Sequence, residues 1–284
     1  MTDFVLEQVA TLAEQPSFDL DGVEVKSAAF REPAPEGGRP IGGLLERLRP
    51  AIARSYNTAG PGYLAYIPGG GVYAAALGGL IASATNRYVG VHARAPTLAR
   101  LEETVTRSLC DWMGLPAGAV GILTCGGSLS NFSAIVTARH ARLGEDLAGG
   151  TIYCSHETHH CVAKARASPA SPARPCVSCQ RTPASAWSRA TSSAPSKRTG
   201  RAACGRSASS RTSAPPTRAP TRCRRSCPSR TRADLWVHAD AAYGGFFRLA
   251  PGGEDLLRGI EECDSITLDP QRASSCPTAS ARCS

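Results

Sequence analysis

The chain has 284 residues, of which 42% are hydrophobic and 19% are charged, and its formal net charge is +9. This length suits one large α/β domain or two small ones. The longest apolar stretch, near residues 72–84, holds several Gly and Ala residues and is too short to span a bilayer, which argues against a membrane protein. A charge of +9 normally indicates a polyanionic partner, but residues 166–232 contain fourteen Arg, one Lys and no acidic residue, so the remainder is acidic.

The N-terminal residues predict two helices separated by a connector. Residues 2–14 place Phe4, Val5, Val9 and Leu12 on one stripe of a helix. Polar, Pro-rich and Gly-rich residues follow up to Pro40. A second helix then carries apolar residues at helical spacing, namely Ile41, Leu44, Leu45, Leu48 and Ile52. We expect residues 1–56 to form an N-terminal helical segment.

Residues 60–71 are too rich in Gly and Pro to form a regular element. Their Tyr63 and Tyr66 either face a bound molecule or pack on the core. A Gly-rich run can cradle phosphate, but this one follows no clear strand and contains no Walker lysine. We therefore do not assign it as a phosphate loop.

Two more helices are predicted before residue 115. Residues 72–86 predict a buried, Ala-rich helix. The next helix has Pro96 in its first turn and stops at Gly114. Its apolar residues recur at helical spacing: Leu98, Leu101, Val105 and Leu109.

Residues 121–135 predict a strand, a Gly-rich turn and a helix with a capped N-terminus. Such a terminus offers backbone N–H groups and the positive end of the helix dipole to an anion. Gly127, Ser128 and Leu129 lie at this turn, although capped turns without a ligand are common. We interpret Cys125 as a bystander rather than a nucleophile.

A short strand predicted at residues 151–154 leads into three closely spaced histidines, His156, His159 and His160. This spacing invites a zinc interpretation. We nevertheless predict no metal site at these histidines.

Residues 166–232 lose the aliphatic pattern, with Val177 and Trp187 as the exceptions. Such a composition buries too little apolar surface to offset its ordering entropy. Three interpretations compete: a disordered basic linker, a metal or nucleic-acid module that uses the Cys pairs, and a stretch read outside the evolved frame. We favour the third, because Ala, Arg, Pro, Ser, Thr and Cys are what a GC-rich gene yields one base out of phase.

Residues 234–249 contain a short apolar run, Leu235–Val237, typical of a buried strand in a parallel sheet. Asp240 follows its carboxyl end, where open α/β sheets bind ligands. A lone Asp there is more often a cap or turn residue. The small residues after it leave room for a flat group to approach the backbone: Ala241, Ala242, Gly244 and Gly245.

The string His238 to Gly245 resembles the pyridoxal-phosphate-dependent amino-acid decarboxylases of the aromatic-amino-acid and glutamate type, and residues 124–131 fit the same family. The resemblance implies that Asp240 binds the pyridinium nitrogen of pyridoxal 5′-phosphate and that His159 stacks on its ring. It also implies that Ala242 presses the other ring face. Gly127, Ser128 and Leu129 would hold the phosphate, and Tyr63 and Tyr66 would face the substrate.

The same resemblance implies an aspartate-aminotransferase-like α/β fold (fold type I) with a mainly parallel sheet, here incomplete, and a homodimer. It implies decarboxylation of a small-molecule amino acid. We expect residues 57–165 and 234–270 to belong to this large domain. Residues 166–233 are then a disordered basic segment, and residues 271–284 an out-of-frame, truncated tail.

The sequence departs from the family after Pro270, where the family continues with His-Lys and this chain has Gln271 and Arg272. The lysine that would bind the cofactor covalently is therefore absent. Arg272 stays protonated and is a poor nucleophile, so we expect the chain as written to be inactive. Loss of one base in codon 271 would produce this tail.

Two other functions remain open from the residues alone. One is a related aminotransferase-like enzyme, and the other is a basic protein that binds nucleic acid nonspecifically through residues 166–232. We predict no specific nucleic-acid partner and no membrane partner. Of the twelve Cys, five lie in the basic segment, two in the last nine residues and five are scattered elsewhere; scattered Cys behind an acidic N-terminus without a signal peptide favour a cytoplasmic location.

Overall fold

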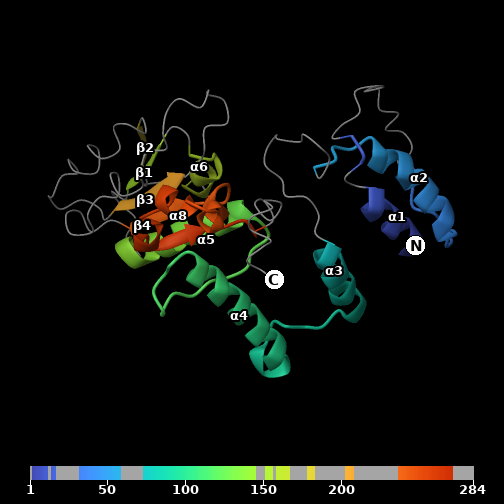
Figure 1. Ribbon diagram of the computed structural model, residues 1–284, viewed down its shortest axis with the longest axis horizontal. Coiled ribbons are helices and arrows are strands. Elements are labelled where there is room, and N and C mark those ends of the chain that lie inside the picture. Colours follow the sequence, from blue (N-terminus) through green and yellow to red (C-terminus); the bar gives the residue numbers. More distant parts are fainter. Residues whose placement is uncertain are drawn as a thin grey trace. The chain divides into compact units, whose positions relative to one another are not determined.

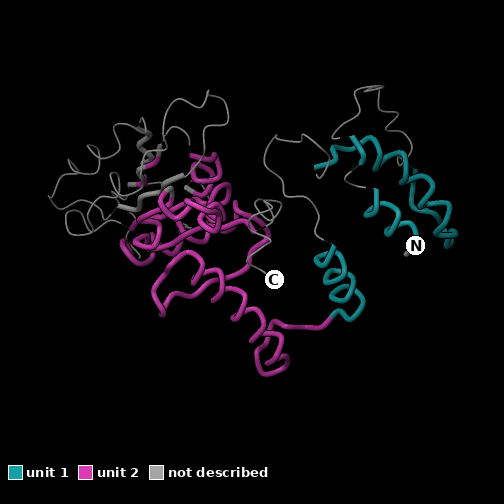
Figure 2. The backbone as a smooth tube through the Cα atoms, viewed as in Figure 1, with its two compact units in different colours: residues 1–86 teal, residues 87–284 magenta. Residues whose placement is uncertain are grey.

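The computed structural model describes residues 2–11, 14–16, 32–58, 73–144, 151–155, 158–166, 178–182, 202–207 and 236–270 (Figure 1). The chain divides into two compact units, residues 1–86 and residues 87–284 (Figure 2). This boundary falls later in the chain than the one expected after residue 56.

The first unit contains the three predicted helices, α1 (Thr2–Thr11), α2 (Ile41–Ala53) and α3 (Tyr73–Thr85). Helix α3 ends where Asn86 takes a positive φ of 40°, a conformation that Asn tolerates better than most residues. The prediction that α3 is buried is wrong: Leu80 and Ile81 are each 64% exposed. An apolar run predicts the helix but does not identify what covers it.

The second unit opens with the short 3-10 helix η2 (His92–Arg94) and helix α4 (Pro96–Trp112). Pro96 lies in the first turn of α4, as predicted. Gly114 takes a φ of 69° just past the helix end, and Leu115 N–H donates to the Cys110 carbonyl at 3.0 Å. This is the hydrogen bond of a Schellman motif. Gly114 ends the helix because glycine adopts the positive φ that this motif requires.

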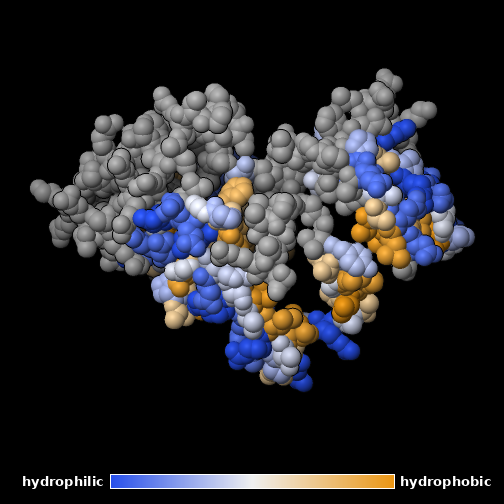
Figure 3. Space-filling model, viewed as in Figure 1, coloured by the Kyte–Doolittle hydropathy of each residue, from blue (hydrophilic) through white to orange (hydrophobic). Residues whose placement is uncertain are grey.

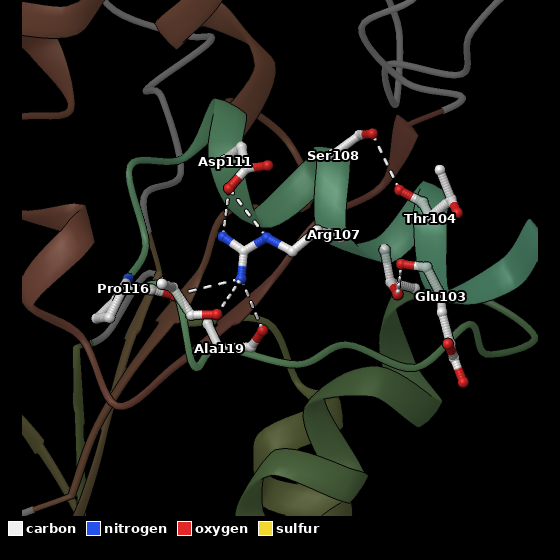
Figure 4. Close-up of polar contacts among 9 residues, drawn as sticks. Glu103, Thr104, Arg107, Ser108, Asp111, Pro116 and Ala119 are labelled. Atoms are coloured by element: carbon white, nitrogen blue, oxygen red, sulfur yellow. Dashed lines mark hydrogen bonds and ion pairs between the residues drawn. The ribbon is translucent and has the colours of Figure 1, made fainter. Parts of the chain in front are cut away.

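Arg107 on α4 holds the loop that follows the helix (Figure 4). Its Nε donates to Asp111 Oδ1 at 2.9 Å, and its Nη2 pairs with the same carboxylate. Its Nη1 donates to the carbonyls of Ala117 at 2.9 Å and Ala119 at 3.0 Å, with a longer contact to Pro116. One guanidinium therefore satisfies several loop carbonyls that form no helical hydrogen bond.

The segment after this loop, residues 119–124, forms no strand in the structure, contrary to the sequence prediction. Val120 is 92% exposed and Ile122 is 70% exposed. The apolar run alone is insufficient, since a strand forms only where a neighbour supplies hydrogen bonds.

Five parallel strands form the sheet in the order β2-β1-β3-β4-β5. They are β1 (Thr151–Ser155), β2 (Ser178–Thr182), β3 (Ala202–Ser207), β4 (Trp236–Asp240) and β5 (Ser265–Thr267). The predicted parallel α/β architecture is therefore confirmed, as are the strands expected near residues 151–154 and 235–237.

Strands β2 and β3 come from the basic segment. The prediction that residues 166–233 lack stable structure is wrong for residues 178–182 and 202–207, which pair with β1 and, in the case of β3, with β4. Backbone pairing needs no aliphatic side chain, so a composition argument overlooks it. The other residues of this segment beyond Arg166 lie outside the described ranges.

Helices and turns cover the sheet on both faces, as expected for parallel strands. On one face, α5 (Gly127–Leu143) and α6 (Cys161–Arg166) pack around Ile135, Ile152 and Val162. The other face holds Ala239 and Ile266 against Ile260 of η6 (Ile260–Glu262). The remaining elements are η5 (Gly245–Leu249) and α8 (Gly253–Leu256).

Candidate active site

Asp240 is the last residue of β4 and is buried, with 8% of its surface exposed. Side chains alternate along a strand, so His238 and Asp240 point to the α5 face while Ala239 points to the opposite face. Asn131 Nδ2 donates to Asp240 Oδ2 at 2.8 Å, and the Ala242 N–H lies 3.3 Å from Asp240 Oδ1. Both carboxylate oxygens thus accept a hydrogen bond.

The turn before α5 is shaped to receive an anion. Gly126 precedes the helix with a φ of 105° and a ψ of 164°, and no side chain caps the terminus. The first turn also lacks an acidic residue. A helix N-terminus in this state presents backbone N–H groups and a partial positive charge.

The backbone N–H groups of the three residues predicted to bind phosphate differ in whether they have an acceptor within the turn or the helix. The Leu129 N–H donates to the Gly126 carbonyl at 3.1 Å, as does the Ser130 N–H at 3.2 Å. Gly127 and Ser128 occupy the first two helical positions, whose N–H groups have no acceptor within the helix. These two residues are therefore better placed than Leu129 to bind an anion.

The start of α5 lies directly against the loop that follows β4. A Cβ atom added at Gly127 would lie 3.5 Å from Ala242 Cβ and 3.9 Å from Thr267 Cγ2. Ser130 Oγ lies 3.0 Å from Thr267 Oγ1, which ties the first turn of α5 to β5. The structure thus brings together Gly127, Asp240 and Ala242, which sequence analysis assigned to a single site.

His159 precedes α6 and is exposed. Its ring centroid lies 4.1 Å from that of His160, and its Nδ1 accepts the Cys161 N–H at 3.3 Å. Cys161 Sγ in turn accepts a 3.3 Å hydrogen bond from Asn131 Nδ2. A path of contacts therefore links His159 to Asp240 through Cys161 and Asn131.

Cys161 is buried beside this carboxylate. Burial raises the pKa of the Cys161 thiol and Asp240 adds to the increase, while the hydrogen bond from Asn131 opposes it. Since a nucleophilic cysteine needs a lowered pKa, Cys161 acts here as a packing and hydrogen-bonding residue.

His238 and Asn131 belong to the site but were not identified as site residues from the sequence. Both are almost fully buried, at 3% and 2% exposure. Burial lowers the pKa of His238 to about 4, although the nearby Asp240 carboxylate opposes the change. A signal was available for His238, because residues two apart in a strand share a face.

The small residues after β4 do not all leave room for a ligand. A Cβ atom at Gly245 would lie 2.5 Å from Leu268 Cδ2 and 3.2 Å from Ala241 Cβ. The expectation of open space is therefore wrong at Gly245, where the absence of a side chain allows Leu268 to pack against the backbone.

Other candidate sites contribute little. An open depression of about 670 Å³ is lined by residues 87–98, none of which was assigned to the site: Arg87, Tyr88, Val91, Arg94, Ala95 and Leu98. Tyr63, Tyr66, His156 and Arg272 lie outside the described residues. Among the residues that are described, no cluster of His, Cys, Asp and Glu suits a metal ion, and no helix is long and apolar enough to cross a membrane.

Comparison with known proteins gives a consistent family match. The model of the pyridoxal-dependent decarboxylase conserved domain matches residues 25–170 and 222–279. The gap between the two matched parts lies inside the basic segment.

Two relatives carry related names. An aromatic-L-amino-acid decarboxylase of Bacillus atrophaeus is 25% identical over 286 residues, which cover 95% of this chain and 57% of that protein. An L-2,4-diaminobutyrate decarboxylase of Rhizobium meliloti (strain 1021) is 30% identical over 138 residues, or 48% of this chain and 28% of that protein. The chain thus spans little more than half the length of the first relative.

Solved structures share the fold. Mouse CSAD in its apo form superposes with a TM-score of 0.74 at 22% identity, covering 96% of this chain and 60% of that one. Oryza sativa TDC with PLP and tryptamine gives a TM-score of 0.68 at 20% identity, covering 95% and 62%.

Proposed function

Because the chain belongs to the pyridoxal-dependent decarboxylase family, we propose that its site binds pyridoxal 5′-phosphate and serves the removal of the α-carboxylate from an amino acid. The family match is to decarboxylases, so the aminotransferase-like alternative is not carried forward. The observation that carries the proposal is the meeting of a buried Asp240 carboxylate with the uncapped N-terminus of α5.

The residues present fit this cofactor. A phosphate group suits the N–H groups of Gly127 and Ser128, because no acidic side chain competes in the first turn. A protonated pyridine nitrogen suits the buried Asp240 carboxylate, to which the described residues donate neutral hydrogen bonds from Asn131 and the Ala242 amide. His159 and Ala242 are the proposed contacts to the ring.

When bound, pyridoxal phosphate supplies an electron sink for the electron pair left by the departing carboxylate. The protein's part is to keep a proton on the ring nitrogen, which Asp240 does by offering a negative charge at that atom. Gly127 and Ser128 orient the group by its phosphate. Tyr63 and Tyr66 are the proposed contacts to the amino-acid substrate.

Cofactor titration tests the site directly. Pyridoxal phosphate added to the purified chain should bind, and Asp240→Asn should weaken binding at least about tenfold, since one charge-assisted hydrogen bond contributes roughly 1.5–3 kcal/mol. Asp111→Asn, at a carboxylate on α4 whose side chain is 61% exposed, is the control and should leave affinity unchanged. A parent chain that binds no cofactor would contradict the proposal.

We also propose that the chain as written does not turn over substrate, because Arg272 occupies the position expected for the cofactor-binding lysine. Borohydride reduction after addition of pyridoxal phosphate should leave no stoichiometrically labelled lysine in a peptide map. Labelling of Lys164 would show that another lysine serves. Inserting one base in codon 271, together with repair of the reading frame over residues 166–232, restores His-Lys after Pro270 and should create a labelled lysine.

The proposal includes a homodimer in a reducing, cytoplasmic compartment. The apolar side chains of α3 are exposed in the single chain (Figure 3), with Leu77 at 43% and Leu80 and Ile81 at 64%. A second copy is a natural cover for such a surface. Cys110 and Cys161 are free thiols, which favours the reducing location.

A further inference from the structure

A continuous line of hydrogen bonds runs from Trp236 to Asp240. Trp236 Nε1 lies 2.9 Å from Ser265 Oγ, which lies 2.8 Å from His238 Nδ1. His238 Nε2 lies 2.9 Å from Asn131 Oδ1, and Asn131 Nδ2 lies 2.8 Å from Asp240 Oδ2. The line joins β4, β5 and α5, and its members Asn131, His238 and Asp240 are buried.

The carboxylate at the Asp240 end sets the direction of the bonds in this line, and the indole at the other end is compatible with that direction. An indole N–H can only donate, so Ser265 accepts from Trp236 and has its own hydroxyl proton to give to His238 Nδ1. His238 then carries its proton on Nε2 and donates to Asn131 Oδ1. The Asn131 amide is left with its NH₂ group toward Asp240, which can only accept as a carboxylate.

A reversed Asn131 amide would break the line at both of its contacts. Its oxygen would face the Asp240 carboxylate, and its NH₂ group would face the N–H of His238. Burial favours the unreversed Asn131 amide further, because a buried polar group without a partner has a higher free-energy cost than one that water can reach.

We propose that Asn131, held by His238, is a positioning residue that keeps the Asp240 carboxylate turned so that Oδ1 is available to the ring nitrogen of the cofactor. The proposal rests on the function proposed above. Asn131 donates a hydrogen bond directly to Asp240. His238 bonds to Asn131 and therefore acts on Asp240 through Asn131.

The surroundings of the line support this role. The titratable groups that face it are Asp240 itself, His238 and the thiol of Cys161, which shares the Asn131 NH₂ group at 3.3 Å. Burial keeps both His238 and Cys161 uncharged, since it lowers the pKa of the first to about 4 and raises that of the second. His238 and Cys161 therefore add no charge beside Asp240.

Imidazole nitrogen NMR on the cofactor-free chain tests the direction. His238 should appear at neutral pH as a neutral ring with its proton on Nε2. A proton on Nδ1 would mean that the Asn131 amide is reversed, and it would overturn the proposal whether or not cofactor binds.

Ring titration tests the positioning role. Pyridoxine 5′-phosphate has the same ring and phosphate as the cofactor but no aldehyde, so it binds without a lysine. Its bound ring nitrogen should lose its proton about one pH unit lower in Asn131→Leu and His238→Leu than in the parent, a tenfold fall in proton affinity. His238→Gln, which restores a donor toward Asn131, should titrate close to the parent.

If the bound ring nitrogen titrates at the same pH in His238→Gln and His238→Leu, the positioning role is wrong, but the proposed cofactor site is not contradicted. A purely structural role predicts that equality, with lower thermal stability in the Leu variant. If the parent binds no pyridoxine 5′-phosphate, the proposed function fails, and the NMR measurement still decides the direction of the line.

Discussion

His238 couples protonation to folding, because the folded chain holds its ring neutral. Its pKa is lowered from 6.5 to about 4 in the folded state, so between these values the unfolded chain binds a proton that the folded chain does not. Stability therefore rises with pH across this window and falls as the solution is acidified from pH 6.5 to 4. Below pH 4 both states are protonated and this contribution stops changing.

We expect the free energy of unfolding of the parent to drop by up to about 3 kcal/mol through this residue between pH 6.5 and 4. His238→Gln removes the titrating group and should flatten the curve over that window. Urea unfolding at several pH values measures the free energy of unfolding of both chains. His92→Gln, at an exposed position on η2, is the control and should keep the parent's pH dependence.

At the scale of elements, the turn before α5 depends on one glycine more than on its neighbour. Gly126 has a φ of 105° and a ψ of 164°, a region in which a side chain is strained, so Gly126→Ala should cost on the order of 1–3 kcal/mol. Gly127→Ala is the matched control. Its added Cβ meets nothing closer than 3.5 Å, and thermal unfolding should show little change in stability.

Arg107 makes a second element-scale prediction. Arg107→Lys keeps the charge but loses the fork that holds Asp111 and the carbonyls of Ala117 and Ala119 together. Amide hydrogen exchange in residues 117–120 should become faster. Arg100→Lys on the same helix is the control, because Arg100 pairs with Glu103 one turn away and its side chain is 73% exposed. Equal exchange in both variants would show that the loop does not need Arg107.

Local signals predicted the elements that depend on local chemistry. Pro96 and Gly114 mark the ends of α4, because proline suits a first turn and glycine suits a positive φ. Strands β2 and β3 escaped prediction because their pairing is supplied by β1 and β4, which lie far away in the sequence. A composition argument has no access to such partners.

The candidate site shows the same division. The motif around Asp240 and the Gly127 turn pointed to residues that the fold brings together. Asn131 was part of the same motif, yet its role depends on meeting His238 and Asp240 on another element. Leu129 was included with its neighbours, although its amide is used inside the turn.

At the scale of the whole molecule, the exposed apolar side chains of α3 predict association. Replacing both Leu80 and Ile81 with Lys should shift the chain from dimer toward monomer, because two charges would be buried at the contact. Light scattering after size exclusion measures the mass. Ser83→Lys, an exposed polar position on the same helix, is the control for added charge. A parent that is already monomeric would contradict the dimer.

The order of the sheet also has a consequence for biosynthesis. Asn131 and Asp240 are separated by 109 positions in the chain, and β3 must lie between β1 and β4 before the sheet can close. At roughly 5–20 residues per second, a ribosome needs on the order of 5–20 s to deliver Asp240 after Asn131. During that interval the amide of Asn131 has water as its partner. The candidate site is thus completed only after β4 and β5 have left the ribosome, so a stalled or prematurely released chain would have the turn before α5 without the Asp240 carboxylate.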